Sequence, residues 1–389
     1  MRFKRKIAEI PLRILVEGTR GKSSTVTLLE EELRREGYRT LGKVTGSDPR
    51  FIWNGDSIDI IRENDVFPLL DYDNMPGILD FDCDALILEN QAITPYTMRF
   101  IHKLIEPQHV VIPNIRIDHT EGLGKNLTEM AKNFVNNYHV GKNQKTVYYG
   151  ETISSIRNQV APVFRDFADK NPHLLKLLEI HPDARYYGLP SIENLYAVSL
   201  FMEHNFGHNL DIQNSIEKEL NNFSVKTSSS SIRYLDLAKV NDPVSFLTVL
   251  KYVLKTTNQD IAVVAYFRKD RMGRNIIFEN IFPELEKITG NRLQKIWFSG
   301  FGTGHSFGKL PPSLREKAEY NIKISDIEDI FTHLITNNLI LVTMCNRVNP
   351  FMDDLVGRLE LPENKFTSIS APKKPIGIKQ PTQEIFFSP

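Results

Sequence analysis

Apolar runs alternate with helical patterns along almost the whole chain. In the first part of the sequence, short β-rich runs predict strands at residues 13–16, 40–44, 85–88, 110–115 and 146–149. Apolar side chains at helical spacing predict helices at residues 22–36 and 127–138. Because strands that alternate with helices form mainly parallel sheets with helices on both faces, we expect an α/β fold of that kind.

A second alternating set follows a mainly helical stretch. Helices dominate the pattern from about residue 153 to residue 222, including residues 192–203 and 212–220. Beyond residue 231 the pattern predicts strands at residues 232–237, 261–267, 295–299, 321–325 and 339–344, with helices at residues 243–254 and 275–288 between them. This set predicts a second, smaller α/β unit.

The two sets meet at a run of small polar residues, from Thr227 to Ser231, that has no apolar anchor. Such a run is typical of an interdomain hinge, although a surface loop within one domain would have the same composition. A length of 389 residues also favours more than one domain. We therefore predict domains at residues 1–228 and 229–389, the second ending in a Pro- and Lys-rich tail from Leu361 onward.

Composition and charge narrow the class of protein. Lys and Arg together number 48, as do Asp and Glu, so no net field attracts the chain to nucleic acid or to an anionic membrane. Two distant cysteines, Cys83 and Cys345, exclude a disulfide scaffold and are expected to be buried thiols. Because the basic N-terminus lacks a signal-peptide apolar stretch, and no apolar window approaches the length of a membrane span, we expect a cytoplasmic protein.

The first candidate for chemistry is a glycine-containing loop. Residues 13–16 lead into Gly18-Thr19-Arg20-Gly21-Lys22-Ser23-Ser24, and the predicted helix 22–36 follows. A strand, a glycine loop and a helix in this order can surround phosphate oxygens with backbone N–H groups at a helix N-terminus. In such a loop Lys22 would bridge the β- and γ-phosphates, and the hydroxyl of Ser23 would help to hold Mg²⁺.

The loop departs from the common phosphate-loop pattern, because Val16 stands where the first glycine of G-x-x-x-x-G-K-[ST] would be. Its form is G-T-x-G-K-S-S. This variant resembles the loop of the Mur ligase superfamily, which reads G-T-x-G-K-[ST]-[ST].

Two later segments fit the same resemblance. Glu89 ends the predicted strand 85–88, where a carboxylate beside a phosphate loop is well placed for Mg²⁺. Asp118 and His119 follow the predicted strand 110–115 and offer an imidazole ligand with a neighbouring carboxylate. Taken singly, Glu89 and His119 would be ordinary surface residues. Together with the loop, they match the Mur-type order of loop, glutamate and N-x-x-x-D-H.

The resemblance is closest to the ligase subunit of poly-γ-glutamate synthases and covers roughly residues 12–360. Residues 41–48, which include Thr45 and Asp48, are similar to that family's G-K-T-T-G-T-D segment. Other matches follow in the same order along the chain. Asn194 stands near the position of a Mur-type nucleotide-contacting asparagine, and Arg233 resembles the arginine that opens the family's C-terminal domain. Asn241-Asp242 resembles an N-D pair before a helix, and Arg268-Lys269-Asp270-Arg271 resembles the family's R-A-D-R motif.

The resemblance implies a fold and a reaction. The fold would be a P-loop domain of the Mur-ligase central type, followed by a smaller Rossmann-like C-terminal α/β domain. The reaction would be ATP-dependent amide formation through an acyl phosphate, joining glutamate units in poly-γ-glutamate synthesis with ATP and Mg²⁺. The family also implies a small membrane protein as a partner, which would hold the enzyme peripherally at the inner face of the membrane.

The resemblance also implies site residues. Those with a catalytic role would be Lys22, Glu89 and His119, and those that hold metal would be Ser23, Glu89 and His119. ATP would be bound by Gly18, Thr19, Arg20, Gly21, Lys22, Ser23, Ser24, Asn194 and Arg233. The substrate would be bound by Thr45, Asp48, Asn241, Arg268 and Arg271.

Two other functions stay open. One is an amide ligase of the Mur or folylpolyglutamate type with a different acceptor. The other is a regulatory P-loop NTPase, although the sequence has no N-K-x-D tetrapeptide for guanine. Residues 300–304, Gly-Phe-Gly-Thr-Gly, lack the last glycine of a dinucleotide-binding loop, and we interpret them as a turn.

Overall fold

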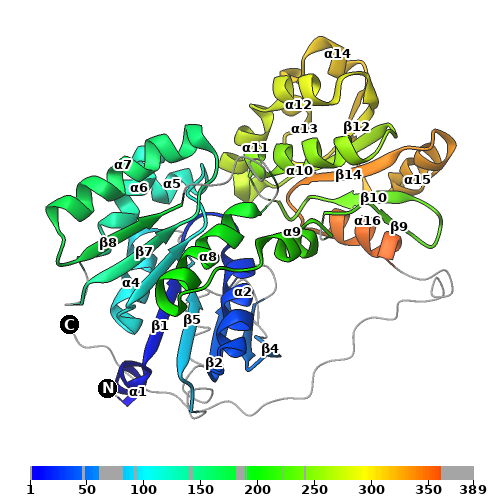
Figure 1. Ribbon diagram of the computed structural model, residues 1–389. Helices are drawn as coiled ribbons and strands as arrows, with labels where there is room; N and C mark the ends of the chain where they lie inside the picture. The colour runs from blue at the N-terminus through cyan, green and yellow to red at the C-terminus, as the bar shows by residue number, and fades with distance from the viewer. Residues whose placement is uncertain are drawn as a thin grey trace, which may run out of the picture.

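The computed structural model describes residues 2–45, 49–60, 82–91, 94–139, 143–180, 189, 191–221, 223–240 and 242–360. Within these residues the chain forms two sheets, each covered by helices on both faces (Figure 1). We call the part before β9 the first lobe and the part from β9 onward the second lobe. No helix of the described ranges is long and apolar enough to cross a membrane.

The first lobe is built on an eight-stranded sheet with the order β4-β3-β2-β5-β1-β6-β7-β8. Strands β2, β5, β1, β6, β7 and β8 run parallel, and β3 and β4 add an antiparallel edge. The strands are β1 (Leu12–Val16), β2 (Thr40–Val44), β3 (Arg50–Trp53), β4 (Asp56–Asp59), β5 (Ala85–Glu89), β6 (His109–Ile112), β7 (Lys145–Tyr149) and β8 (Leu175–Glu179).

Both faces of this sheet are buried, as the continuous apolar strands require. On β1, Leu15 packs into one core while Ile14 and Val16 pack into the other, because successive side chains of a strand point to opposite faces. Helices α4, α6 and α7 cover the first face, and α2 and α8 cover the second. The helices of this lobe are α1 (Arg2–Glu9), α2 (Lys22–Arg35), α4 (Pro95–Ile105), α5 (Thr120–Leu123), α6 (Leu127–Val135), α7 (Ser154–Lys170), α8 (Ile192–Phe206) and α9 (Ile212–Asn221).

The second lobe is built on a six-stranded sheet with the order β13-β12-β11-β14-β10-β9, in which only the short β9 is antiparallel to its neighbour. Its strands are β9 (Lys226–Thr227), β10 (Arg233–Asp236), β11 (Ile261–Phe267), β12 (Leu293–Gly300), β13 (Ala318–Ile322) and β14 (Ile340–Cys345). Its helices are α10 (Pro243–Thr256), α11 (Met272–Glu279), α12 (Phe282–Thr289), α13 (Thr303–Lys309), α14 (Pro312–Arg315), α15 (Ile327–Thr336) and α16 (Pro350–Glu360). The expected fold class, two α/β units with mainly parallel sheets, is therefore confirmed.

Several elements differ from the sequence prediction. The stretch predicted to be helical contains β8, an edge strand whose Lys176 and Glu179 interrupt the apolar pattern. The helix predicted at residues 275–288 is two helices, α11 and α12, because the chain turns after Asn280 and Pro283 begins a new helix. The strand predicted at residues 321–325 lies three residues earlier, at β13, and a short 3₁₀ turn follows it.

The run from Thr227 to Ser231 is the turn of the β9–β10 hairpin and lies within the second sheet. The backbone N–H of Ser228 donates to the carbonyl of Ile232 at 2.8 Å, and the Ser228 hydroxyl accepts from the N–H of Ile232 at 3.0 Å. The hinge interpretation of this run is therefore corrected, because its small side chains close a tight turn on their own backbone. The division into domains 1–228 and 229–389 stays a prediction, and the tail after Leu361 lies outside the described residues.

Both cysteines are buried free thiols, as expected. Burial raises the pKa of Cys83 to about 11 and that of Cys345 to about 12, so both thiols stay protonated at neutral pH.

Candidate functional site

The phosphate-loop segment has the conformation that its glycines permit. It connects the end of β1 to the start of α2, and both Gly18 and Gly21 have positive φ angles, of 106° and 77°. A Cβ atom on Gly18 would lie 2.4 Å from the carbonyl oxygen of Asn114, and one on Gly21 would lie 2.0 Å from Oδ1 of Asn194. Only glycine fits either position, so the loop, α8 and the chain after β6 are packed against one another.

Asn114 fixes this loop from the neighbouring strand. Its Oδ1 accepts from the backbone N–H of Arg20 at 3.1 Å and from the hydroxyl of Thr19 at 3.2 Å. Its Nδ2 donates to the carbonyl of Arg20 at 3.2 Å and to Oε1 of Glu193 at 3.1 Å. Asn114 is the asparagine of the N-x-x-x-D-H pattern that ends at His119, and it ties the loop to the chain after β6 and to α8.

Three predicted residues meet at the start of α2. The hydroxyl of Ser23 donates to Oε2 of Glu89 at 2.9 Å, and the same oxygen accepts from the backbone N–H of Thr45 at 2.9 Å. Burial lowers the pKa of Lys22, and the nearby carboxylate of Glu89 opposes that shift. Glu89 therefore links the end of β5, the end of β2 and the phosphate loop.

The pair Ser23 and Glu89 fits a divalent cation. A hydroxyl and a carboxylate at the end of a parallel strand are oxygen ligands of the kind that Mg²⁺ prefers, with waters and phosphate oxygens completing its shell. Among the described residues no group of three or more His, Cys, Asp or Glu side chains could hold a metal by itself. The donor set thus suits an ion that arrives with a phosphate ligand.

His119 and Asp118 lie after β6, where the backbone of His119 is left-handed with a φ of 47°. Nε2 of His119 is 3.5 Å from Oδ2 of Asp118, and that oxygen also pairs with Nη2 of Arg20 at 2.7 Å. Burial lowers the pKa of His119, and Asp118 opposes the shift only in part. Burial also disfavours the charge of Asp118, but Arg20, His119 and Arg274 outweigh it and lower its pKa.

The R-K-D-R motif of the second lobe contributes two cations to this edge in different ways. Arg268 pairs with its own neighbour, as its Nε donates to Oδ1 of Asp270 at 2.9 Å. Arg271 lines a small cleft of about 50 Å³ together with Asp118 and His119 of the first lobe. Arg274, one turn further, places Nη2 at 3.9 Å from Oδ1 of Asp118. Burial lowers the pKa of Arg274 to about 10, so it stays charged at neutral pH.

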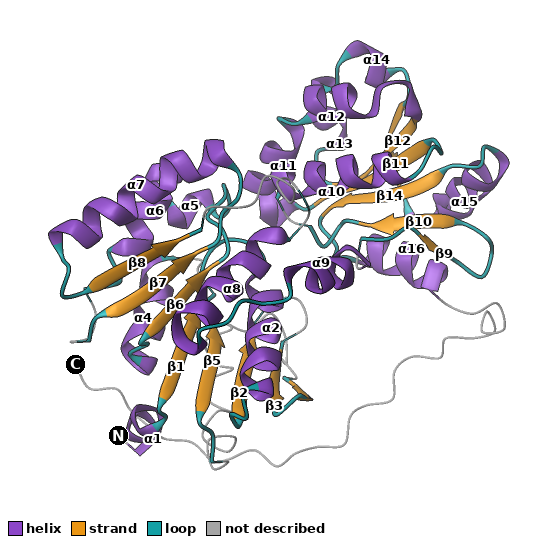
Figure 2. Cartoon of the chain, in the orientation of Figure 1, coloured by secondary structure: helices purple, strands orange, loops and turns teal. Residues whose placement is uncertain are grey.

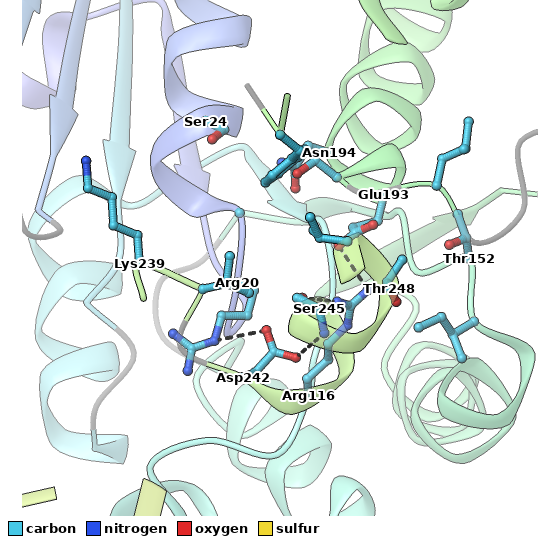
Figure 3. Close-up of a pocket in the computed structure, with 17 residues that line it drawn as sticks. Arg20, Ser24, Arg116, Thr152, Glu193, Asn194, Lys239, Asp242, Ser245 and Thr248 are labelled. Atoms are coloured by element: carbon cyan, nitrogen blue, oxygen red, sulfur yellow. Dashed lines mark hydrogen bonds and ion pairs between the residues drawn. The ribbon is translucent and has the colours of Figure 1, made fainter. Parts of the chain in front are cut away.

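A larger cavity, of about 210 Å³, lies between the lobes beside the phosphate loop (Figure 3). Arg20, Gly21, Ser24 and Asn194 line one side of it. Apolar side chains line much of the rest, namely Ile153, Leu189, Phe223, Val240 and Val249. Within the described part of the chain, the buried Oδ1 of Asn194 has no hydrogen-bond partner, so it is available to a ligand in this cavity.

Two arginines of the first lobe reach the N-terminus of α10 across this cavity, as Figure 3 shows. Nε of Arg20 is 3.4 Å from Oδ2 of Asp242, and Nη1 of Arg116 donates to the hydroxyl of Ser245. Arg116 also pairs with Glu193, at 2.9 Å. Although burial opposes its charge, Glu193 and Glu151 raise the pKa of Arg116, so the group stays ionised.

The structure does not gather every predicted residue. Arg233 begins β10, at the end of the strand opposite the one that faces the first lobe, and is not among the described residues that line the large cavity. Asp48 and Asn241 lie outside the described residues. The predictions for these three residues stay untested by the geometry. Of the others, Glu89 and Thr45 meet the loop, Asn194 lines the large cavity, and His119 and Arg271 line the small cleft between the lobes. Arg268 donates within the second lobe, to Asp270 and Val348.

Sequence reasoning missed Arg116, Arg274, Glu193 and Ser245 as site residues. Arg116 stands inside the N-x-x-x-D-H pattern, two residues before Asp118, so its position was an available signal. Glu193 directly precedes Asn194 on α8 and meets Asn114 and Arg116 within the first lobe. Arg274 and Ser245 lie on α11 and α10, and the packing of the two lobes brings them to the site.

Comparison with known proteins gives relatives of one kind. No family model matches the chain. It is 28% identical over 170 residues to the capsule biosynthesis protein CapB of Bacillus anthracis and 31% identical over 137 residues to the PGA synthase CapB of Bacillus subtilis. These matches cover 43% and 34% of the chain, and the chain spans about a third of the length of each relative, 35% in both cases.

Solved structures share the fold over almost the whole chain. MurF of Acinetobacter baumannii superposes with a TM-score of 0.60, covering 92% of this chain and 78% of that one, at 13% identity. A bifunctional folylpolyglutamate synthase/dihydrofolate synthase of Yersinia pestis, complexed with AMPPNP and Mn, gives a TM-score of 0.59 over 92% of each chain, at 14% identity. Another structure of a bifunctional synthase of this type contains Mn, AMPPNP and L-glutamate.

The resemblance predicted from the sequence is thus confirmed. The chain is similar in sequence to CapB proteins and has the fold of the Mur ligases and folylpolyglutamate synthases. The expected fold, a larger α/β domain followed by a smaller one, agrees with the two lobes.

Proposed function

We propose that this chain is an ATP-dependent ligase that activates a carboxylate as an acyl phosphate and joins it to an amine, forming an amide. One observation carries the proposal. The phosphate loop follows β1, Glu89 ends β5, and the pair Asp118-His119 comes after β6. These three strands are adjacent and parallel, so the three groups share one edge of the sheet. That edge faces the cationic start of α11 in the second lobe, and Figure 2 shows the strand arrows of the first sheet pointing toward that lobe. The similarity to CapB proteins supports the same conclusion.

The nucleotide would lie between the loop and the large cavity. Backbone N–H groups of residues 18–24 would surround the phosphates at the N-terminus of α2, with Lys22 between the β- and γ-phosphates. The mixed apolar and polar cavity beside Asn194, Arg20 and Ser24 suits a nucleoside. The AMPPNP in a solved relative of the same fold supports ATP as the nucleotide.

Mg²⁺ would be held by Ser23 and Glu89, with His119 as a ligand for a second ion. When bound, such ions neutralise the charge that develops on the transferred phosphoryl group. The protein itself fixes their ligands in advance, since Glu89 is buried and already hydrogen-bonded to Ser23 and to the backbone of Thr45. The Mn in the folylpolyglutamate synthase structure supports a divalent ion at this site. That this ion is Mg²⁺ is our more specific proposal.

The reaction has two steps. In the first, an oxygen of the acceptor carboxylate attacks the γ-phosphorus and the bond to ADP breaks, giving an acyl phosphate. In the second, an amine attacks the acyl carbon, phosphate leaves and the nitrogen loses a proton. Lys22 stabilises charge on the phosphoryl group, and Arg271 and Arg274 lie where a carboxylate of the substrate would arrive.

Other substrate contacts follow from the family resemblance. They are Thr45 and Asp48 on the acceptor side, and Asn241 and Arg268 in the second lobe. The closure of the second lobe on the first would bring these groups together and exclude water.

The proposed substrate is glutamate or a growing γ-glutamyl chain, because the matched curated relatives are CapB proteins and one is named as a PGA synthase. A second candidate is an amide ligase of the folylpolyglutamate type with another acceptor. The likeness in fold to folylpolyglutamate synthases over 92% of the chain favours it. A regulatory P-loop NTPase would need neither His119 nor the arginines of α11.

One assay separates these functions. The protein is incubated with ATP, Mg²⁺ and a candidate acid, with and without hydroxylamine, and ADP and hydroxamate are measured. A γ-glutamyl ligase forms both with glutamate or γ-glutamyl oligomers, and a folylpolyglutamate-type enzyme forms both only with a pteroate acceptor. ADP release that does not depend on any carboxylate, with no hydroxamate, would refute the ligase proposal.

Variants strengthen the assay. Lys22→Ala removes the cation at the phosphates and should abolish ADP formation, while Lys170→Ala, an exposed change on α7, should have wild-type activity. His119→Ala should lower kcat more than it weakens ATP binding. Wild-type turnover in His119→Ala would contradict the second-metal role.

We also propose a cytoplasmic enzyme that works at the inner face of the membrane with a small membrane protein. This follows from the resemblance to poly-γ-glutamate synthases alone. Copurification of the chain with a small membrane protein from its own cells, and release of the chain when that protein is deleted, would support it. Activity that is undiminished in the deletion strain would contradict it.

A further inference from the structure

A second hollow lies outside the nucleotide cavity, between α2 and α9. It encloses about 640 Å³ and is lined by α2 from Ser23 to Arg35, by Arg50 of β3, and by the chain from Asn209 to Lys218. We call it the α2–α9 groove. Twelve residues of α2 separate its two ends, which corresponds to about 18 Å at 1.5 Å per residue. The groove is therefore long enough for an extended chain.

The lining combines polar and charged side chains with three leucines, Leu28, Leu195 and Leu210. Thr27, Asn209, Asn214 and Ser215 offer hydroxyl and amide groups. Cations are present at Arg35, Arg50 and Lys218, and carboxylates at Glu31, Glu32 and Asp211. Donors, acceptors and charges of both signs beside apolar surface suit a chain whose repeating unit has methylene groups, an amide and a carboxylate.

At the outer end, Glu31 pairs with two of these cations, and Arg35 also pairs with the buried Glu32. Nζ of Lys218 lies 3.0 Å from Oε2 of Glu31, with 71% of the Lys218 side chain exposed. Nη2 of Arg35 lies 2.7 Å from Oε1 of Glu31. Exposed pairs of this kind contribute little stability, so a carboxylate of a ligand can replace Glu31 at low cost.

The inner end of the groove opens at the proposed reaction centre. Ser23 lines the groove and donates to Glu89, while Ser24 lines both the groove and the nucleotide cavity. Arg50 begins β3, which pairs with β2 just before Thr45. A chain in the groove would therefore present its terminal carboxylate beside Ser23 and Glu89, next to the phosphate loop.

We propose that the α2–α9 groove holds the acceptor chain, an extended, amide-linked and carboxylate-bearing chain of γ-glutamyl units, with its activated end at Ser23. This inference rests on the proposed function and adds the binding site of the chain. A γ-glutamyl unit has five backbone bonds and spans about 6 Å, so the groove holds about three units. The affinity for acceptors should therefore rise up to about three or four units and then level off.

The test places a bulky side chain in the groove. Asn214→Trp and Ser215→Trp, on the face of α9 that lines the groove, are compared with Glu217→Trp, an exposed change on the same helix outside the lining. Hydroxamate formation is measured with glutamate and with γ-glutamyl oligomers of increasing length. We expect the two groove variants to lose on the order of tenfold in kcat/KM for the long acceptors, with glutamate turnover unchanged and Glu217→Trp like wild type.

Two results would overturn the proposal that the α2–α9 groove binds the acceptor chain. One is a wild-type length dependence in both groove variants, and the other is an equal loss for glutamate and for long acceptors, which would indicate structural damage. Binding of a γ-glutamyl hexamer by calorimetry separates the groove from the proposed reaction, since it needs no turnover. If wild type shows no ADP or hydroxamate but binds the hexamer, and Asn214→Trp does not bind it, the reaction is wrong and the groove stands. If neither protein binds the hexamer, the groove is refuted.

Discussion

Replacing Asn114 with alanine should release the phosphate loop from the rest of the first lobe. Asn114 is fully buried, and its amide makes four hydrogen bonds to Thr19, Arg20 and Glu193 at 3.1–3.2 Å. The side chain of alanine has no donor or acceptor that could replace these hydrogen bonds. The backbone N–H and carbonyl of Arg20 would then have to find other partners inside the protein.

The magnitude follows from the atoms left without partners. A buried polar atom that loses its hydrogen bond costs about 1–3 kcal/mol. Glu193 keeps its pair with Arg116 at 2.9 Å, so the main loss falls on the two backbone groups of Arg20. We expect the free energy of unfolding to fall by about 2–6 kcal/mol, the sum for two such groups. At about 2–4 °C per kcal/mol for a lobe of this size, Tm should fall by about 4–24 °C.

Two measurements check this prediction. Urea unfolding gives the stability loss, and titration with AMPPNP and Mg²⁺ gives the nucleotide affinity, which should fall with it because the loop is no longer preorganised. Asn258→Ala, an exposed asparagine of the second lobe, is the control and should match wild type in both. If Asn114→Ala unfolds like the control and binds AMPPNP like wild type, these hydrogen bonds do not hold the loop.

Three further predictions concern the same lobe. Gly21→Ala should abolish AMPPNP binding because its new Cβ would lie 2.0 Å from a side-chain oxygen, whereas Gly207→Ala, with the same φ of 77° but open space around it, should cost only about 1–2 kcal/mol and bind AMPPNP normally. Ser23→Ala should raise the Mg²⁺ concentration needed for half-maximal ADP formation about tenfold or more, and an unchanged Mg²⁺ dependence would contradict the metal assignment. Burial lowers the pKa of His109 to about 4, so between about pH 6.5 and 4 the folded state binds fewer protons than the unfolded state. The stability that neutral His109 contributes is thus fully present above about pH 6.5 and is lost as the pH falls. Urea unfolding should show a free energy of unfolding that is about 2 kcal/mol lower at pH 5 than above pH 6.5. An equal loss in His109→Gln would show that another group is responsible.

Much of the fold followed from the sequence because the central strands are buried on both faces. Their apolar runs, such as residues 261–267 in β11, stand out from the helical patterns around them. The edge strand β8 does not, because only Leu175 is fully buried and the remaining positions carry mixed side chains. A pattern read from the chain alone therefore finds the centre of a sheet more readily than its edges.

The site was predictable only where its residues are local. The loop from Gly18 to Ser24 and the pair Asp118-His119 are short motifs directly after strands, so topology alone brings them to one edge. Arg116 and Ser245 touch although 129 positions separate them. Their contact depends on how the second lobe packs against the first, and no short pattern in the sequence encodes it.

If the site binds a nucleotide as proposed, the ion pairs at the junction predict that it also needs a divalent cation. Arg20 is already paired with Asp118 at 2.7 Å, and Arg116 with Glu193 at 2.9 Å, so their charges are largely neutralised before any ligand arrives. Lys22 lies in a buried setting that disfavours its own charge. A triphosphate would therefore bring several negative charges to a site whose buried cations are mostly compensated. Because desolvated charge is costly without a partner, we expect binding of the phosphates to depend on a divalent ion beside the phosphate loop, near the oxygens of Ser23 and Glu89.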